Sequence, residues 1–166
     1  MNLKKNIKKF YRYIYIYGFR RTLIKTLSRI RPKIKIWFLL KFPFYHKNEI
    51  KIAIIGCGQH AYSSIAYFLT LYSNSRIVFV FDKNSYAAKS LAYAYNSINI
   101  SESEIDSSIL KHKPEIVYIA SNHSTHTYYA LKFLEYGCKV YIEKPIALNY
   151  EQLETLSKYG NNIKSH

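Results

Sequence analysis

The sequence has 166 residues, 49% of them hydrophobic and 17% aromatic, which suits one globular domain and is too short for two full ones. Its net charge of +15 is unevenly spread, because residues 1–48 hold 14 Lys/Arg and no Asp/Glu, whereas residues 49–166 hold 11 Lys/Arg and 10 Asp/Glu. The globular part is therefore nearly neutral, which argues against a nucleic-acid-binding fold and indicates a basic arm.

Residues 1–48, here called the extension, carry apolar residues at helical spacing. The pattern predicts two amphipathic helices that are separated at Gly18 and end before Pro32. The recurring apolar positions are Ile7, Phe10, Tyr11, Ile14, Leu23, Ile24 and Leu27. Two interpretations stay open: the helices lie on an anionic membrane surface, or they pack on their own domain or a partner. The sequence shows no secretory signal, so we expect a cytoplasmic protein and leave association with the inner face of the membrane open.

An alternation of apolar runs and helical patterns begins at Glu49. Strands are predicted at Ile50–Ile55, Arg76–Phe81, Ile98–Ile100, Glu115–Ala120 and Val140–Ile142. Helices are predicted at His60–Tyr72, Ser85–Tyr95, Glu102–His112 and Ser124–Tyr136, and a last one begins after Asn149. Short connections between buried strands imply right-handed crossovers, so residues 49–166 are predicted to form an α/β fold, a doubly wound parallel sheet of the Rossmann type. No sixth strand is expected before His166.

The two cysteines, Cys57 and Cys138, each lie beside a glycine at a strand edge. The sequence has no CxxC spacing and no paired histidines of the kind that bind zinc. We therefore interpret both cysteines as small buried apolar residues in a reducing compartment, and we predict no metal site.

A glycine-rich turn follows the first predicted strand and opens the first helix, with the sequence Gly56-Cys57-Gly58-Gln59-His60-Ala61. This is the context of a dinucleotide fingerprint of the form GxGxxG/A. Gly56 would permit the tight turn, Gly58 would let a pyrophosphate approach the backbone, and Ala61 would let helix and strand pack closely. S-adenosylmethionine enzymes also have glycine-rich first turns, so the turn alone leaves both classes open.

Asp82 ends the second predicted strand, where a carboxylate accepts hydrogen bonds from an adenosine ribose. Because a carboxylate repels a 2′-phosphate, NAD is favoured over NADP, although the neighbouring Lys83 leaves NADP open. The alternative interpretation is a loop aspartate that caps the next helix.

Two further polar segments follow the fourth and fifth strands. The loop Ser121–His126 holds two histidines, an amide and three hydroxyl groups, and its alternative interpretation is a polar loop in which Asn122 or Ser124 caps the helix. Glu143-Lys144-Pro145 places a lysine at the carboxyl end of a buried strand. There Lys144 could stabilise a developing alkoxide or share its proton with a substrate hydroxyl, unless it is simply a solvated surface lysine.

From Lys51 to about Leu156 the sequence resembles the amino-terminal Rossmann domain of the Gfo/Idh/MocA oxidoreductases, the glucose-fructose oxidoreductase and inositol dehydrogenase group. The motifs that carry the resemblance are the glycine-rich turn, Asp82, the run from Ile119 to His126, and the run from Val140 to Pro145. The forms Gly-Cys-Gly-Gln and Ser-Asn-His-X-X-His, with a basic leader, resemble members found with surface-polysaccharide biosynthesis.

The resemblance implies hydride transfer between NAD, or NADP, and a hydroxyl carbon of a sugar, nucleotide sugar or cyclitol. It implies that Lys144 is the catalytic residue assisting that hydroxyl, that His126 lines the cofactor pocket and that Glu143 faces the cofactor. The residues assigned to cofactor binding are Gly56, Gly58, Gln59, His60, Ala61, Asp82, Ser121, Asn122, His123, His126, Glu143 and Pro145. Asn122 and His123 depart from the family, which usually has prolines there.

The family continues into a second domain that builds the substrate pocket, supplies an Asp-X-X-X-His acid/base motif and makes the oligomer contact. No carboxylate and histidine with that spacing follow Pro145. We therefore expect residues 49–166 to be a Rossmann domain truncated before the second domain, which binds NAD weakly and does not turn over substrate alone. The alternatives are a noncatalytic nucleotide-binding module and a protein that acts at a membrane surface through its basic extension.

Overall fold

The apolar runs of residues 49–166 pair into one parallel sheet. The computed structural model describes residues 3–41, 49–72 and 74–165. Its strands are β1 (Ile50–Ile55), β2 (Ser75–Phe81), β3 (Ile98–Asn99), β4 (Ile116–Ile119), β5 (Lys139–Ile142) and β6 (Ile163–Ser165). The strand order is β3-β2-β1-β4-β5-β6, and neighbouring strands pair in parallel throughout the described residues. This order is the doubly wound arrangement that the sequence predicts.

Helices connect these strands and cover both faces of the sheet. They are the π-helix Ala61–Ile65, which continues into α4 (Ala66–Tyr72), and then α5 (Ser85–Tyr95), α6 (Ile105–His112), α7 (His126–Glu135) and α8 (Tyr150–Ser157). The expected helix His60–Tyr72 is thus present but starts with a π-turn. Both helix ends have ordinary caps: Gly137 has φ of +78° after α7, and the Asn149 side chain accepts a hydrogen bond from the amide of Gln152 at the start of α8.

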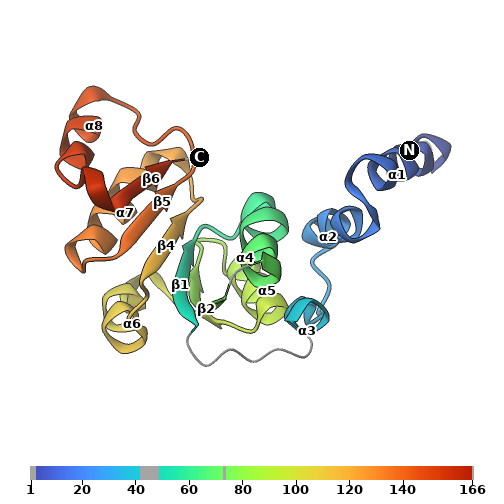
Figure 1. The fold of residues 1–166 in the computed structure, drawn as a ribbon, viewed down its shortest axis with the longest axis horizontal. Coiled ribbons are helices and arrows are strands. Elements are labelled where there is room, and N and C mark those ends of the chain that lie inside the picture. Colours follow the sequence, from blue (N-terminus) through green and yellow to red (C-terminus); the bar gives the residue numbers. More distant parts are fainter. Residues whose placement is uncertain (1–2, 42–48, 73, 166) are drawn as a thin grey trace.

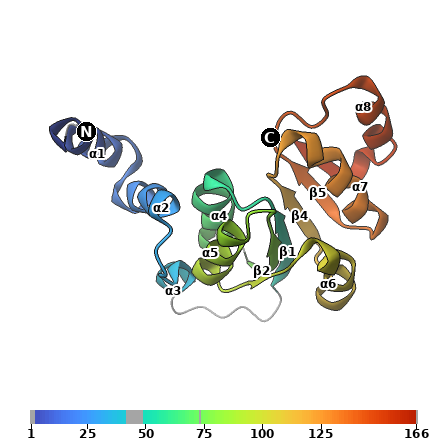
Figure 2. The ribbon, with the colours of Figure 1, turned by 180° about the vertical axis from the view of Figure 1, so that it is seen from behind.

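Alternate residues of the central strand β1 point into two separate cores. Ile52 and Ile54 pack with α4 and α5 on one face, whereas Ala53 and Ile55 pack with α6, α7 and α8 on the other. Figures 1 and 2 show these two groups of helices on opposite sides of the sheet. Because both faces are covered, the strand is apolar on both, as the continuous run Ile52–Ile55 indicates.

The expectation that no sixth strand is present was wrong. β6 lies beside β5, with Ile163 opposite Val140 and Ser165 opposite Ile142. Its sequence lacks the apolar run that marks a buried strand, because it lies at the sheet edge and pairs with β5 through the backbone. Its three residues therefore carry no periodic signal.

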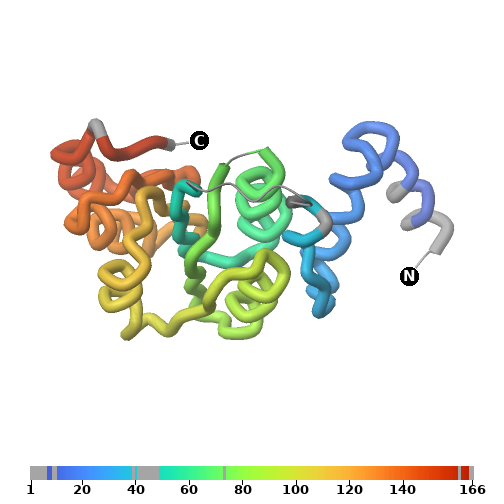
Figure 3. Tube along the Cα trace, turned by 60° about the horizontal axis from the view of Figure 1, so that its bottom comes forward, coloured from blue at the N-terminus to red at the C-terminus, as the bar shows by residue number. Residues whose placement is uncertain are grey.

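The extension forms α1 (Leu3–Tyr17), α2 (Phe19–Ile30) and a short third helix, α3 (Ile36–Lys41). Gly18 separates the first two with φ of +79°, and α2 ends at Arg31, which has φ of 51°. The two predicted helices and their boundaries are confirmed, whereas α3 was not predicted. Figure 3 shows the extension at one end of the molecule and the carboxyl-terminal strand at the other.

α2 and α3 pack on the Rossmann part. Ile24 and Ile36 are 5% and 0% exposed and belong to the same core as α4 and α5. Of the two interpretations left open, packing on its own domain therefore describes α2 and α3. Residues 1, 2 and 42–48 of the expected 1–48 segment lie outside the described residues. Within the described ones, no helix is both long and apolar enough to cross a membrane.

Candidate functional site

The strands around the centre of the sheet end side by side. Ile55 of β1 lies opposite Ile119 of β4, which in turn lies opposite Ile142 of β5. Gly56 and Glu143 therefore leave the sheet at the same edge, here called the carboxyl edge. The order in which the strands are added to the sheet reverses between β1 and β4: β2 and β3 lie on one side of this point, and β5 and β6 lie on the other. Open α/β sheets bind their ligands outside such a switch point.

The two glycines of the turn after β1 differ in why glycine suits each position. A Cβ at Gly56, which has φ of +91°, would lie 2.4 Å from Ala120 C and O and from Ser121 N, so no other residue fits there. A Cβ at Gly58 would meet nothing within 4 Å, and Gly58 is exposed. The protein itself thus has no packing need for glycine at 58, whereas a pyrophosphate approaching the backbone would need that space. The turn therefore fits a dinucleotide.

Asp82 lies at the end of β2 and holds the glycine-rich turn. Its Oδ2 accepts a hydrogen bond of 2.6 Å from the Cys57 amide, and its Oδ1 accepts one of 2.7 Å from the Asn84 amide. The helix α5 is capped by Asn84, whose Oδ1 accepts from the amides of Tyr86 and Ala87. The alternative that Asp82 caps the next helix is therefore wrong, and its partly exposed carboxylate lies beside the glycine-rich turn.

Arg31 braces the same turn from the other side, a role that the sequence did not predict. Its guanidinium donates to the carbonyl of Cys57 at 2.6 Å and to that of Ala87 at 3.0 Å, and lies 5.1 Å from the ring centroid of Tyr62. The peptide groups around Cys57 are thus held between Asp82 and Arg31. These contacts join residues 26 and 56 positions apart, so no local pattern could have revealed them.

The loop after β4 exposes its most polar residues. Asn122, His123 and Ser124 are exposed, whereas Ser121 Oγ and Thr125 Oγ1 lie 2.9 Å apart and bond to each other. Neither Asn122 nor Ser124 caps a helix through its side chain. The exposed amide, imidazole and hydroxyl of residues 122–124 are therefore available to a ligand at the carboxyl edge.

His126 is fully buried, so it cannot itself form the exposed wall of a cofactor pocket. Its Nδ1 lies 2.9 Å from the Pro145 carbonyl and its Nε2 lies 3.1 Å from the Ser121 carbonyl. The ring of His123 packs edge-on against it, with centroids 5.4 Å apart. His126 thus ties the loop after β4 to the loop after β5 and positions both.

Glu143 and Lys144 leave β5 in different directions. Glu143 Oε1 lies 2.7 Å from Nε2 of His60, which links the end of β5 to the glycine-rich turn. Lys144 is exposed, and in the described part of the chain no carboxylate contacts its ammonium group. The bond between Lys144 and Pro145 is cis. A cation with open surroundings at the carboxyl edge can reach a substrate hydroxyl.

The two cysteines are buried, as predicted, and they carry no nucleophile. Burial raises the pKa of the Cys57 thiol strongly; the nearby Asp82 raises it further, and Arg31 opposes this. Burial alone raises the pKa of Cys138 to about 11. Both thiols are therefore protonated at neutral pH and unreactive. Over residues 3–41, 49–72 and 74–165, no cluster of His, Cys, Asp and Glu is arranged to hold a metal ion.

Residues 50–162 match the family described as "Oxidoreductase family, NAD-binding Rossmann fold" (GFO_IDH_MocA). The chain belongs to the Gfo/Idh/MocA family of oxidoreductases. This excludes the S-adenosylmethionine enzymes as an explanation of the glycine-rich turn. The predicted fold class and the nicotinamide dinucleotide as cofactor are thereby confirmed, since the matched family domain binds NAD.

Several Gfo/Idh/MocA proteins resemble this chain over the same region. D-glucoside 3-dehydrogenase of Escherichia coli (strain K12) is 32% identical over 105 residues, which are 63% of this chain and 30% of that protein. The myo-inositol dehydrogenase of Lactobacillus casei, solved with NAD(H) and myo-inositol, aligns with a TM-score of 0.62 and 19% identity, covering 71% of this chain and 36% of that one. The 3-ketoreductase KijD10 of Actinomadura kijaniata, solved with NADP and TDP-benzene, aligns with a TM-score of 0.61 and 18% identity over 69% and 34%.

The chain thus spans about a third of the length of these Gfo/Idh/MocA relatives. The names of two of these relatives state their substrates, a D-glucoside and myo-inositol. At 19% and 18% identity, the two solved structures show only that this chain shares their fold.

Proposed function

We propose that this protein provides the dinucleotide-binding half of an oxidoreductase that transfers a hydride between a nicotinamide cofactor and a hydroxyl carbon of a sugar, nucleotide sugar or cyclitol. The observation that carries the proposal is the convergence of the open turn at Gly58, the carboxylate of Asp82 and the ammonium of Lys144 on one edge of the sheet. We place the reaction in surface-polysaccharide biosynthesis, as the forms of the two motifs suggest.

Each residue at the carboxyl edge has a distinct proposed role. Gly58 and the helix start behind it receive the pyrophosphate, because Gly58 is exposed and a Cβ there would meet nothing within 4 Å. The exposed amide and imidazole of Asn122 and His123 contact the far half of the dinucleotide. His126 holds their loop against Pro145. Glu143 fixes His60 at the front of the glycine-rich turn.

Lys144 is the proposed catalytic residue. The bound cofactor supplies or accepts the hydride, and the chain's own contribution is to the hydroxyl that loses or gains a proton. In the reducing direction the Lys144 ammonium donates a hydrogen bond, and then its proton, to the oxygen that gains negative charge; in the oxidising direction the neutral Lys144 amine accepts the proton of the hydroxyl. The side chain is exposed and pairs with no described carboxylate, so its ammonium group is available to a substrate.

We propose NAD as the preferred cofactor. The Asp82 carboxylate is fixed by two backbone amides, so it cannot easily turn away from a 2′-phosphate, and repulsion disfavours NADP. Lys83 is exposed beside it and softens this preference. Exchanging Asp82 for Asn should therefore narrow the difference in affinity between NADH and NADPH, and equal ratios in both proteins would contradict this assignment.

The substrate half of the site is proposed to come from a second domain, because this chain covers only about a third of its relatives. We propose that residues 1–48 are an extension and residues 49–166 the dinucleotide-binding domain. Residues 1–166 alone should bind NADH without turning over sugar. Steady NADH production from a sugar by the purified chain, without an added partner, would contradict the proposal.

The test of the catalytic residue is a chimera in which residues 1–165 precede the remaining part of the Escherichia coli relative. In this protein Lys144→Ala should lower turnover of a glucoside by about 10²- to 10⁴-fold, the usual contribution of a group that handles a proton. NADH affinity should change little. Lys158→Ala removes an equally exposed lysine after α8 and should leave turnover unchanged. Equal turnover by the Lys144→Ala chimera and its parent would contradict the catalytic role of Lys144, and NADH binding without turnover by the parent chimera would support a noncatalytic module.

We also propose that α1 rests on an anionic membrane surface. Tyr15, Tyr11 and Ile16 are 93%, 68% and 55% exposed, on a helix that also carries Lys8 and Arg12 and no acidic residue. Large exposed apolar side chains beside cations suit the interface of a negatively charged bilayer. Replacing Tyr11 and Tyr15 by Ser should weaken sedimentation with phosphatidylglycerol vesicles, and unchanged sedimentation would overturn this proposal.

A further inference from the structure

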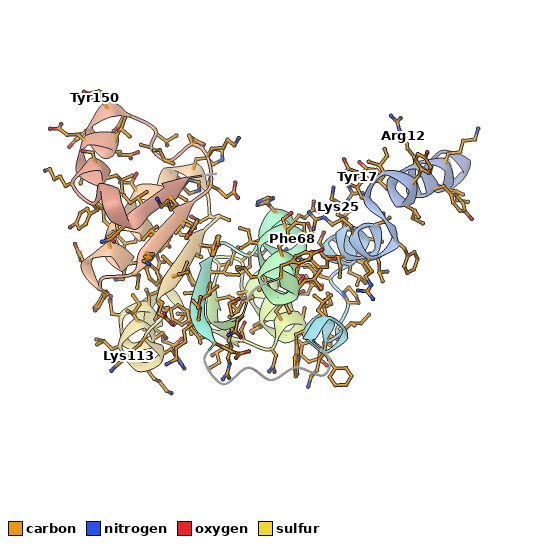
Figure 4. All side chains as sticks on the ribbon, viewed as in Figure 1. Arg12, Tyr17, Lys25, Phe68, Lys113 and Tyr150 are labelled. Carbon is orange, nitrogen blue, oxygen red and sulfur yellow. The ribbon has the colours of Figure 1, made fainter. Side chains whose placement is uncertain are left out.

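A cleft of about 530 Å³ lies between α2 and the beginning of the helix that follows β1. One wall carries Arg21, Lys25 and Arg29 of α2, and the other carries Gln59, His60 and Ser63 from the glycine-rich turn and the π-helix. The other lining residues add hydroxyl groups, and no carboxylate lines the cleft. Figure 4 shows Lys25 and Tyr17 of the extension close to Phe68 of α4, on the side of α4 that faces the extension.

The three cations of the cleft have no acidic counterpart. Among the described residues, ion pairs join His60 to Glu143 and Lys132 to Asp106, and neither includes a residue of α2. Three like charges that share one cleft repel each other, so an anion that enters it is favoured by all three.

Two of the cations are held in place by contacts that leave their charge uncompensated. The Arg21 guanidinium donates to the Ser63 carbonyl and, at 2.9 Å, to Ser64 Oγ, and lies 4.6 Å from the ring centroid of Phe68. The Lys25 ammonium lies 4.3 Å from the ring centroid of Tyr17. These contacts orient the charges before any ligand arrives. Preorganised guanidinium and ammonium donors, with hydroxyl groups around them, are the chemistry that recognises a phosphate.

We propose that this cleft, built jointly by the extension and the glycine-rich turn, binds a phosphate or diphosphate group. The group would belong either to a soluble phosphate-bearing sugar or to the headgroup of a lipid. The cleft adjoins the cofactor turn, which contributes Gln59 and His60 to its lining, whereas its three cations come from α2 and not from the carboxyl ends of the strands. Binding that persists with saturating NADH present distinguishes this phosphate from the pyrophosphate of the dinucleotide. It gives the basic extension a ligand-binding role beyond packing on the domain.

The cleft adjoins the proposed reaction site through His60. The imidazole both lines the cleft and bonds to Glu143, the residue before Lys144. A sugar whose phosphate is held in the cleft is therefore the substrate class that we infer, and this step rests on the proposed function. The binding of the phosphate itself does not depend on hydride transfer.

The test is a binding titration of the full chain with saturating NADH present. The probes are inorganic pyrophosphate, UDP, and phosphatidylcholine vesicles with and without phosphatidic acid. The variant Lys25→Gln/Arg29→Gln removes two cleft cations and keeps the Arg21 contacts that hold α2. The matched control Arg20→Gln/Lys33→Gln removes the same charge from exposed positions of the extension outside α1 and outside the cleft lining. Each lost charge-assisted bond should cost about tenfold in affinity.

Weakening of pyrophosphate or UDP binding by tenfold or more in the cleft variant, and by less than about threefold in the control, would support a soluble ligand. The same pattern with phosphatidic acid vesicles, and no binding of the soluble probes, would support a lipid headgroup. Equal weakening in both variants, or no binding of any probe, would overturn the proposal. NADH affinity, measured without the probes, should be the same in all three proteins, so its loss in every protein would count against the proposed function and not against the cleft.

Discussion

The carboxyl edge of the sheet and the α2 cleft balance their charges differently. At the edge, the Asp82 carboxylate is bonded to backbone amides and Glu143 is paired with His60. In the cleft, the cations of α2 face hydroxyl groups and aromatic rings without a described carboxylate partner. At the carboxyl edge a bound pyrophosphate would therefore meet mainly backbone groups. In the cleft a bound anion would meet the side-chain cations of α2.

The difference also concerns what holds each region in place. The register of the parallel strands fixes the carboxyl edge. Ile55, Ile119 and Ile142 lie side by side, so the residues that follow them leave the sheet next to each other. The cleft depends on a few arginine contacts between the extension and the Rossmann part. The edge should therefore be sensitive to backbone changes, and the cleft to changes of single charged side chains.

The largest effect is expected for Gly56→Ala, which would disturb the packing of the glycine-rich turn against the loop after β4 at the carboxyl edge. The new Cβ would lie 2.4 Å from the backbone of Ala120 and Ser121, and φ of +91° is strained for alanine. We expect a loss of about 3 kcal/mol or more in the free energy of unfolding, measured by urea denaturation. Gly58→Ala is the matched control, because its Cβ meets nothing within 4 Å, and it should change stability by less than about 1 kcal/mol. Similar destabilisation by both changes would contradict this account of the turn.

A smaller effect is expected for Arg31→Gln, which would remove the hydrogen bonds that Arg31 of the extension donates to the Cys57 and Ala87 carbonyls. The change removes hydrogen bonds from a guanidinium to two backbone carbonyls and its contact with the Tyr62 ring. We expect the unfolding free energy to fall by about 2 kcal/mol and NADH affinity to fall several-fold, because the Cys57 peptide loses one of its two supports. Arg20→Gln, at an exposed position of α2, should alter neither. If both variants behave alike, the turn does not need Arg31.

The smallest effect should come from a charge pair far from both regions. Lys132 Nζ lies 2.7 Å from Asp106 Oδ2, and this hydrogen bond lowers the pKa of Asp106. A lowered pKa means that the pair stabilises the fold above the ordinary aspartate pKa of about 3.9 and that this contribution is lost as the pH falls below it. Because Asp106 is half exposed, we expect less than about 1 kcal/mol. Urea denaturation of the parent and Asp106→Asn should differ at pH 7 and converge near pH 3, and a constant difference would contradict this assignment.

The sequence predicted those parts of the molecule in which a local pattern determines the structure. Continuous apolar runs gave β1, β2, β4 and β5, and the positions of Gly56, Asp82 and Lys144 near strand ends follow from those runs. β6 was missed because an edge strand of three residues pairs through its backbone and needs no apolar pattern. The position of His126 was predicted, but its burial was not.

The contribution of the extension could not be read from the sequence. Arg31 and Arg21 bond to residues 26 to 56 positions away, and nothing beside them in the chain distinguishes them from the other cations of the extension. The amphipathic spacing of α2 predicted a helix and left its partner open. Only tertiary packing, with Ile24 and Ile36 in the core, decides that the partner is the Rossmann domain.

The most direct test of the central claim, that this chain binds a nicotinamide dinucleotide at the turn after β1, is a calorimetric titration of the purified chain with NADH. The parent should bind NADH, and Gly58→Ala should bind it about tenfold more weakly or worse at unchanged thermal stability, because a methyl group would fill the space left open for the pyrophosphate. Equal NADH affinity in the two proteins, or no binding by the parent, would contradict the claim.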